Sequence, residues 1–279
     1  MELYYEGSDG SIINFMENPL FAQSPETLTS NSWSYSTISG VNGLGRVKRF
    51  YKDTQEAELK LSVMTNTAEE FNDVMYNLHR VFDRDIRRLQ PGKLWWNGFY
   101  KEVFAVETSQ DEFEELFEAV EKSITFISVY PYWVKKTVYH FIDLTTEEEE
   151  EGLDYDDYDY EYDFDLGSLI ESVNNDCIDK ANFEIKFYGA CQNPSVIIGG
   201  HTYEMLVDLD DGEYCTVNSL TKKIIKYDVY GNEENVFYLR GRDSYIFEPI
   251  PEGENIVLRG EDLKVDITIF DERGEPEWI

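Results

Sequence analysis

Positive charge is scarce in this sequence. Lysine and arginine number 24 against 57 acidic residues, and the formal net charge is −33. Because phosphate binding needs a basic face that displaces counterions, this imbalance argues against direct binding to nucleic acid. An anionic membrane surface would repel the chain for the same reason.

Cysteines and long apolar runs are scarce as well. Cys177, Cys191 and Cys215 form no C-x-x-C pair, and an odd number cannot close completely into intrachain disulfides, so we expect packed, reduced thiols. No window approaches the roughly 18 apolar residues of a membrane span. The first residues lack the basic start and apolar run of a signal peptide, so we expect the chain to be made and folded in a cytoplasm.

Motifs for catalysis and metal binding are missing. His79, His140 and His201 are scattered without a zinc motif, and there is no G-x-S-x-G elbow and no P-loop. If Gly152 were the sixth residue of a calcium loop, the twelfth would be Tyr158 instead of the required bidentate Glu. We therefore predict a protein that is not an enzyme, with no catalytic residue, no cofactor and no resident metal. Weak calcium binding by the acidic loop stays open.

What the sequence does contain is enough apolar material for packed cores. Hydrophobic residues make up 42% of the chain and aromatic residues 15%, far above the composition of disordered chains. One core rarely grows past roughly 250 residues, so 279 residues favour two domains.

Regular alternation of apolar and polar residues predicts a mainly β protein. Residues 57–63 place Ala57, Leu59, Leu61 and Val63 on one side, which is the period of a half-buried strand. Asn97-Gly98 stands between two aromatic runs and predicts a two-residue hairpin, and Asp211-Gly212 repeats that signal.

One segment has helical spacing instead. Thr67 and Glu70 are spaced as a capping box, and Pro91-Gly92 follows as a stop signal. Between them, one helical stripe of apolar residues comprises Phe71, Val74, Met75, Leu78, Val81 and Phe82. The spacing predicts one helix over 68–88, packed on a sheet.

Acids are concentrated at 147–165, which contain twelve acids and no base. The alternation at 159–166 would put four acids on one face of a strand, where neighbours repel by about 0.6 kcal/mol, and aromatic or aliphatic residues on the other, where each gains roughly 1.5 to 3 kcal/mol on burial. We therefore predict a solvated linker or loop at 143–158 and a strand at 159–166.

Short alternating segments broken by Gly, Asn, Asp or Pro follow to the end, at spacings of about ten residues that are typical of a sandwich or jelly roll. The predicted organisation is a first domain at 1–142, the acidic linker at 143–158 and a second domain at 159–279.

A basic island interrupts the acidity. Residues 44–101 hold eleven bases against eight acids, a net charge of +3. Either the island is an ordinary solvated face, or it meets an acidic surface of a neighbouring copy in a head-to-tail ring. The candidate ring-interface residues are Arg46, Lys48, Arg49, Arg80, Arg84, Arg87 and Arg88.

The order of motifs resembles a known family. "RVKRFYKDTQEAELKLSVMTNTAEEFNDVMYNLHRVF", "PGKLWWNGFYKEVFAV" and "YPYW" resemble the first domain of distal tail proteins from long-tailed, siphovirus-type phages of Gram-positive bacteria. "NFEIKFYGACQNPSVIIGGHTY", "EYCTVNSLTKKII", "YGNEENVFYL", "YIFEPIPEGENIV" and "RGEPEW" are similar to that family's carboxy-terminal domain. The resemblance covers nearly the whole chain and rests on turns and strands, not on catalytic groups.

This resemblance implies a structural virion protein: a homohexameric ring that joins the tail tube to the baseplate. The first domain would be a tail-tube-like β-sandwich or barrel with one helix, and the second a galectin-like β-sandwich of jelly-roll type. Implied partners are further copies of itself, the major tail tube protein, a tail-associated or tail-tip protein, and receptor-binding or baseplate proteins. Its place would be the tail tip of the virion, after synthesis in the host bacterial cytoplasm.

Two other functions stay open. A β-sandwich rich in aromatics could be a carbohydrate-binding module that contacts the host cell wall, although we interpret Trp33, Trp95, Trp96 and Trp133 as core or interface residues. A glycosidase needs only two carboxylates in the correct geometry, and 57 acids supply many pairs.

Overall fold

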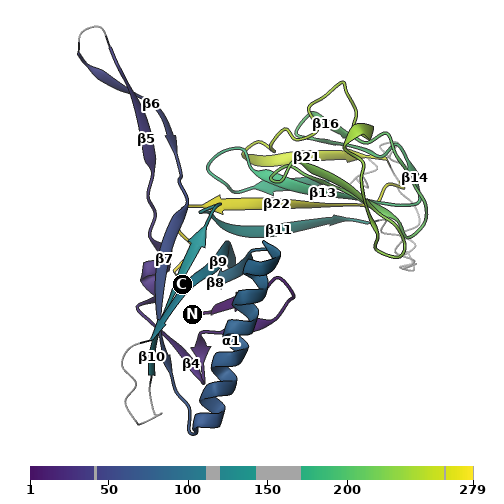
Figure 1. Cartoon of the computed structure of the whole chain (residues 1–279). Coiled ribbons are helices and arrows are strands. Elements are labelled where there is room, and N and C mark those ends of the chain that lie inside the picture. The colour runs from purple at the N-terminus through teal and green to yellow at the C-terminus, as the bar shows by residue number, and fades with distance from the viewer. Residues whose placement is uncertain (41–42, 111–119, 143–170, 261, 279) are drawn as a thin grey trace, which may run out of the picture. The chain divides into compact units, whose positions relative to one another are not determined.

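The alternating segments form the strands of two separate units. The computed structural model describes residues 1–40, 43–110, 120–142, 171–260 and 262–278. The first unit is Met1–Lys135 with Glu272–Ile279, and the second is Lys136–Asp271. Both consist mainly of strands, as Figure 1 shows, and the described residues contain one α-helix, which belongs to the first unit. The predicted mainly β chain with one helix is confirmed.

The first unit is built from antiparallel strands. They are β1 (Leu3–Glu6), β2 (Ile12–Asn14), β3 (Met16–Glu17), β4 (Leu20–Gln23), β5 (Ser34–Ser39), β6 (Gly45–Tyr51), β7 (Gln55–Val63), β8 (Gly92–Trp96), β9 (Phe99–Gln110), β10 (Val120–Ser128) and the start of β11 (Trp133–Phe141). Strand β7 lies between β4 and β10, β9 pairs with β8, β10 and β11, and β1 lies between β2 and β8. A short 3-10 helix, η1 (Pro25–Thr29), precedes β5.

Burial follows the predicted alternation along β7. Leu59, Leu61 and Val63 are fully buried, whereas Glu58 and Lys60 are exposed. The Asn97-Gly98 hairpin is also confirmed, because both residues have positive φ angles of 45° and 81° and Trp96 pairs with Phe99 across the turn. Each buried leucine or valine contributes roughly 1.5 to 3 kcal/mol to the stability of this core.

The helix α1 (Ala68–Arg88) has the predicted bounds. The Thr67 hydroxyl accepts a hydrogen bond from the Glu70 backbone N–H at 3.1 Å, and the Glu70 carboxylate accepts one from the N–H of Asn66 at 2.9 Å. The cap therefore satisfies two backbone donors, although the second lies one residue earlier than in a standard capping box. Leu89 ends the helix in a left-handed conformation. The stripe packs into the core, with Phe71, Leu78, Val81 and Phe82 buried and Val74 and Met75 half-buried.

The second unit has two main sheets around one core. Its strands are β12 (Ser172–Asn175), β13 (Asn182–Tyr188), β14 (Cys191–Gln192), β15 (Ser195–Ile198), β16 (His201–Glu204), β17 (Asp208–Leu209), β18 (Tyr214–Asn218), β19 (Lys223–Tyr227), β20 (Glu233–Asn235), β21 (Gly253–Arg259) and β22 (Val265–Arg273, to Asp271 in this unit). One sheet has the order β20-β19-β18-β13-β22-β11 and the other β12-β21-β15-β16. Phe183 and Ile185 of the first sheet share a core with Val196 and Val257 of the second. This arrangement is a β-sandwich.

The boundaries differ from the predicted ones at both ends. Residues 136–142 belong to the second unit, where β11 lies beside β22, and residues 272–279 return to the first. There the Asn97 amide donates to the backbone oxygens of Glu277 and Trp278, at 3.2 Å each, and the Trp278 ring lies 5.6 Å from that of Trp96. Local alternation carries no sign of such a return. The predicted linker at 143–158 and strand at 159–166 lie outside the described residues.

At Asp211-Gly212 the predicted turn is present, but the predicted hairpin around it is not. The chain turns at Asp211-Gly212, and the N–H of Glu213 donates to the oxygen of Asp210 at 3.0 Å. The flanking strands are no hairpin, however, because β17 pairs with β14 and β18 pairs with β13 and β19. A turn sequence fixes local φ angles, whereas the partner of each strand depends on the whole sandwich.

Candidate assembly surface

The β5–β6 hairpin leaves the rest of the first unit as a two-stranded ribbon. Figure 1 shows it as a long projection, and in the described part of the chain its strands pair only with each other. Tyr35 and Phe50 lie opposite each other with ring centroids 6.3 Å apart, and they are 63% and 61% exposed. Other exposed apolar side chains on or beside the hairpin are Trp33, Ile38, Leu44 and Val47. A two-stranded ribbon is marginal in water, and exposed apolar clusters of this kind mark interaction sites.

The charge of the hairpin is opposite to that of the chain. Residues 27–52 contain no acid, and Arg46, Lys48 and Arg49 of β6 are all exposed. The Arg49 guanidinium lies 4.9 Å from the centre of the Tyr51 ring. The hairpin is therefore both apolar and basic on a strongly acidic protein.

The base of the hairpin is held by polar contacts. The Lys52 Nζ donates to the side chain of Asn31 at 2.6 Å and lies 4.7 Å from the ring centre of Tyr132. Burial lowers the pKa of this amine. The Ser34 hydroxyl donates to Asp53 at 2.5 Å. These contacts hold the base of the hairpin against the first unit. Beyond the base, β5 and β6 pair only with each other in the described residues.

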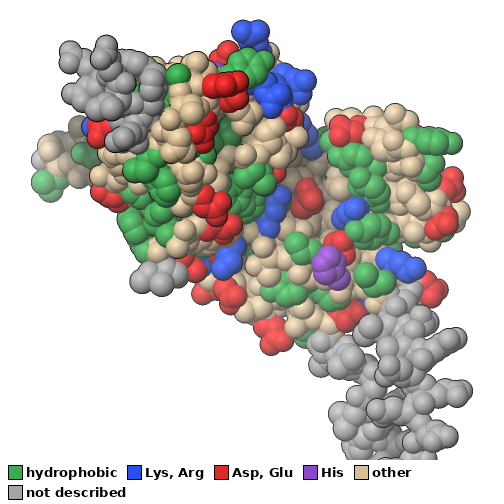
Figure 2. Space-filling view, turned by 90° about the horizontal axis from the view of Figure 1, so that it is seen from below, with side chains coloured by type: hydrophobic (Ala, Val, Ile, Leu, Met, Phe, Trp, Pro, Cys, Tyr) green, Lys and Arg blue, Asp and Glu red, His purple; other side chains and the backbone are tan. Residues whose placement is uncertain are grey.

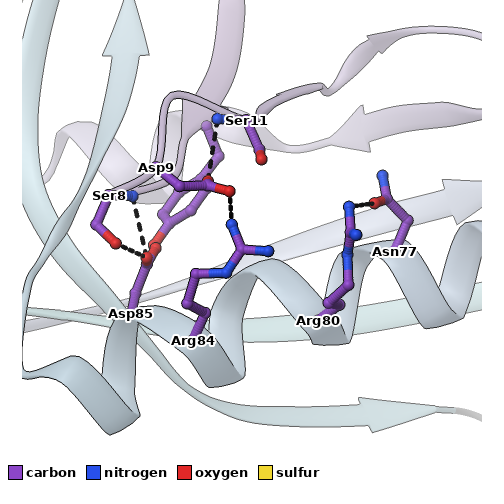
Figure 3. Close-up of polar contacts among 8 residues, drawn as sticks. Ser8, Asp9, Ser11, Asn77, Arg80, Arg84 and Asp85 are labelled. Carbon is purple, nitrogen blue, oxygen red and sulfur yellow. Dashed lines mark hydrogen bonds and ion pairs between the residues drawn. The ribbon is translucent and has the colours of Figure 1, made fainter.

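The helix arginines form a second, separate group. Arg80 donates to the Asn77 side chain at 3.0 Å, and Arg84 forms an ion pair with Asp9, as Figure 3 shows. Arg87 lies 3.9 Å from Asp83, one turn earlier. A shallow groove of about 510 Å³ on this side of α1 is lined by Tyr76, His79, Arg80, Asp83, Arg84, Arg87 and Arg88.

Asp85 is a residue that the sequence analysis missed. It is 1% exposed, and its carboxylate accepts hydrogen bonds from the Tyr5 hydroxyl at 2.6 Å, the Ser8 hydroxyl at 2.5 Å and the Ser8 backbone N–H at 3.0 Å. Figure 3 shows Ser8 and Asp9 above the helix, facing Asp85 and Arg84. Burial and the Asp85 carboxylate raise the pKa of Tyr5. Asp85 follows Val81 by four residues and so lies on the buried stripe of the helix. This position could have predicted that the acid is buried and hydrogen-bonded.

The seven candidate basic residues therefore do not form one patch. Arg46, Lys48 and Arg49 lie on β6, and the four arginines lie on α1, which Figure 1 shows as a separate element. Arg84 is half-buried and already neutralised by Asp9. The first group lies among exposed apolar side chains of a two-stranded ribbon, and the second lies near the exposed Tyr76, Ile86 and Leu89 on or next to α1.

Lys101 is a further titratable group that the sequence did not single out. It is 4% exposed on β9, and its Nζ lies 4.7 Å from the ring centre of Trp133, 3.3 Å from Gln55 Oε1 and 3.5 Å from the Leu28 oxygen. Burial, with a smaller contribution from Lys52, lowers the pKa of Lys101 to about 8.

The other features considered in the sequence are metal ligands, cysteines, tryptophans and membrane spans, and each can be examined in the described residues. There, no group of three or more His, Cys, Asp or Glu side chains is placed to hold a metal ion. Cys215 is buried, Cys177 and Cys191 are half-buried, and none of the three forms a disulfide. Trp96 and Trp133 are fully buried, whereas Trp33 is exposed beside the hairpin. Of the helices that the structure describes, none combines the length and the apolar character needed to cross a membrane.

Comparison of the sequence with known proteins gives no match, either to a family model or to a curated protein.

Comparison of the fold gives clear matches to solved phage structures. A chain of the phage P2 baseplate in its activated conformation with calcium has a TM-score of 0.64 at 13% identity, over 99% of this chain and 100% of that one. The phage p2 baseplate in its activated conformation with strontium gives 0.64 at 12% identity, over 99% of both chains. The Dit protein of phage SPP1, described as a paradigm of the hub adsorption apparatus in phages that infect Gram-positive bacteria, gives 0.57 at 10% identity, over 97% of this chain and 98% of that one. The chain thus has the fold of these phage proteins along almost its whole length.

Proposed function

We propose that this chain, with the fold of baseplate and Dit proteins, is a structural virion protein that assembles into a homohexameric hub at the distal end of a phage tail. The hub would join the tail tube to the baseplate or tail-tip proteins. The observation that carries this proposal is the β5–β6 hairpin, in which the apolar side chains of Tyr35, Ile38, Val47 and Phe50 are exposed. Such a ribbon needs a partner surface to be stable.

A second copy of this chain is the partner that fits. The outer face of the β7 and β10 strands carries three exposed acids, Glu56, Glu58 and Glu121, and one exposed base, Lys60, so it is negative overall. The hairpin carries Arg46, Lys48 and Arg49 and no acid. Two different surfaces of one protein are then complementary in charge, and contacts of this head-to-tail kind close into rings.

The two units would divide the work. The first unit would be the tail-tube-like, ring-forming part, and the second a galectin-like sandwich at the outside of the ring. Expected partners are the major tail tube protein, the tail-associated or tail-tip protein, and receptor-binding or baseplate proteins, in the tail tip of the virion. The role is mechanical and involves no reaction and no cofactor. The names of the structural neighbours support it, since each is a baseplate or hub protein.

The helix arginines are a second proposed contact of the ring, weaker than the hairpin. Arg80, Arg87 and Arg88 are exposed and free to meet an acidic surface, although Arg80 and Arg87 also contact Asn77 and Asp83. Arg84 would act only indirectly, through its ion pair with Asp9.

Native mass spectrometry of the purified chain tests the hub. We expect a hexamer for the unchanged chain and a monomer for the double variant Val47→Ser, Phe50→Ser, which removes two exposed apolar side chains of β6. The control is Val138→Ser, which makes at an exposed position of β11 the same change as Val47→Ser and should leave the hexamer intact. A monomeric unchanged chain, or a double variant that still assembles, would refute the proposal.

The alternative function is a carbohydrate-binding module that contacts the host cell wall. One feature favours it, a groove in the second unit lined by two tyrosines, a histidine and charged groups. A monomer that binds wall polysaccharide would support this alternative, and a hexamer without such binding would support the hub alone.

A further inference from the structure

A groove of about 580 Å³ lies on the outer face of the β13 and β18 strands in the second unit. It is lined by His140, Ile142, Lys186, Tyr188, Gly189, Asp211, Gly212, Glu213, Tyr214, Lys264 and Asp266. Strand alternation explains the lining, because Ile185 and Phe187 point into the core and leave Lys186 and Tyr188 on the other face. A volume of this size is typical of small-molecule sites, which range over roughly 300 to 1,000 Å³.

Two tyrosines of adjacent strands, Tyr188 and Tyr214, line one side of the groove. Tyr188 lies opposite Tyr214, and Tyr214 lies opposite Tyr227, in adjacent strands. The rings of Tyr214 and Tyr227 are stacked with centroids 4.6 Å apart, and Tyr188 follows at 6.3 Å from Tyr214. Tyr227 lies outside the lining and stacks on Tyr214, and Lys186 lies over the Tyr214 ring, so Tyr214 offers a ligand its ring edge and its hydroxyl, which can donate and accept hydrogen bonds.

Polar groups are fixed beside these tyrosines. The Asp266 carboxylate accepts a hydrogen bond from the Tyr188 hydroxyl at 2.6 Å and lies 2.8 Å from Nδ1 of His140. Burial and Asp266 raise the pKa of Tyr188, so its hydroxyl stays protonated. The Lys186 Nζ lies 3.9 Å and 4.6 Å from the ring centres of Tyr214 and Tyr188. In the described residues no ion pair holds this ammonium group, so its donors remain available.

The groove is close to neutral, in contrast to the rest of the chain. Its lining carries the two lysines Lys186 and Lys264 against Asp211, Glu213 and Asp266, and Glu213 is paired at 2.7 Å with Lys226, which lies outside the lining. An anionic ligand would gain no net attraction there and would be repelled by a protein of charge −33. Mixed donors and acceptors beside two tyrosines suit an uncharged ligand that carries many hydroxyls.

We propose that this groove binds a neutral saccharide, with pyranose hydroxyls on Lys186, Asp266 and His140 and its carbon skeleton beside Tyr188 and Tyr214. The site does not depend on ring assembly. Oligomeric state and sugar binding are measured separately. A hexamer that binds no sugar would refute only the saccharide site, and a monomer that binds sugar would refute only the hub.

Saturation-transfer NMR on the full chain tests the site. The probes are the methyl glycosides of glucose, galactose, rhamnose and N-acetylglucosamine, and neutral oligosaccharides released from Gram-positive cell walls. We expect transfer to at least one neutral probe, and titration should then show an affinity about tenfold or more lower for Lys186→Met and for Asp266→Asn, since each removes a charge-assisted hydrogen bond.

Matched controls make the same charge changes outside the groove. Lys223→Met and Asp243→Asn are exposed substitutions in the second unit, and both should bind like the unchanged chain. Circular dichroism confirms that each variant is folded. Absence of transfer to every neutral probe, equal binding by groove variants and controls, or binding of poly(glycerol phosphate) in place of the neutral probes would overturn the proposal.

Discussion

Two β-hairpins of the first unit carry aromatic side chains in opposite surroundings. In the hairpin of β8 and β9, the paired Trp96 and Phe99 are both 0% exposed, whereas in that of β5 and β6 the paired Tyr35 and Phe50 lie in solvent. The first hairpin is covered by its own chain, including the returning Trp278. The second has no such cover among the described residues. The first hairpin therefore belongs to the core of the subunit, and the second is the one that we propose as an interface.

The largest expected effect comes from comparing one aromatic residue of each hairpin. Trp96→Ala removes a fully buried ring and should lower the free energy of unfolding by about 3 to 5 kcal/mol. Phe50→Ala should change the unfolding of the monomer by no more than about 0.5 kcal/mol, because the ring is exposed there. Urea unfolding at a concentration that keeps the chain monomeric measures both. Equal losses would mean that the hairpin is part of the subunit core.

Lys101 is a buried charge in the core of the first unit and makes the stability of this core depend on pH. The pKa of a lysine is 10.5 in the unfolded chain and falls to about 8 for Lys101 in the fold. The folded state therefore binds fewer protons between these values, so stability rises with pH from about 8 to 10.5. Below pH 8 the buried charge costs up to about 3 kcal/mol.

We accordingly expect Lys101→Met to stabilise the chain at pH 7 by about 1 to 3 kcal/mol, since the lost contacts with Gln55 and Trp133 offset part of the gain. The advantage should shrink as the pH approaches 10.5. Lys60→Met, an exposed change on β7, is the control and should show no such trend. Denaturant midpoints at pH 7, 8.5 and 10 decide; a pH-independent difference would contradict the lowered pKa.

Asp85 tests how the helix is fixed to the first strands. Asp85→Asn keeps the shape but replaces an acceptor of three hydrogen bonds, and should cost about 1 to 3 kcal/mol. The neighbouring Asp83→Asn changes an exposed side chain whose ion pair is 3.9 Å long, so it should cost less than about 0.5 kcal/mol. Similar thermal midpoints for the two variants would contradict the anchoring role.

The smallest expected effect concerns charge at the exposed hairpin. Lys48→Glu with Arg49→Glu should weaken assembly by about 1 kcal/mol, more at low salt, because interface charges are screened. Adding Glu56→Lys and Glu58→Lys should restore assembly if the hairpin meets that face of a neighbouring copy. Arg84→Glu with Arg88→Glu should have a smaller effect, since Arg84 is already paired with Asp9. Sedimentation velocity at two salt concentrations measures all three; no rescue would mean another partner face.

Local chemistry was predictable, and long-range contact was not. The bounds of α1 follow from Thr67 and the apolar stripe, and the β8–β9 turn follows from Asn97-Gly98, because these signals act within a few residues. The return of 272–279 to the first unit and the bonds of Asp85 to Ser8 depend on residues far apart in sequence. For the same reason, the sequence did not predict that the basic residues of 44–101 lie on two separate elements, β6 and α1.

Hydrogen exchange of the assembled chain tests the central claim most directly. In the assembly, the backbone amides of β5 and β6 should exchange much more slowly than in the monomeric Val47→Ser, Phe50→Ser variant, because a neighbouring copy covers them. The amides of β8 and β9 should exchange alike in both. Equal, fast exchange of the hairpin in both samples would contradict the account, since it would leave the exposed ribbon without a partner.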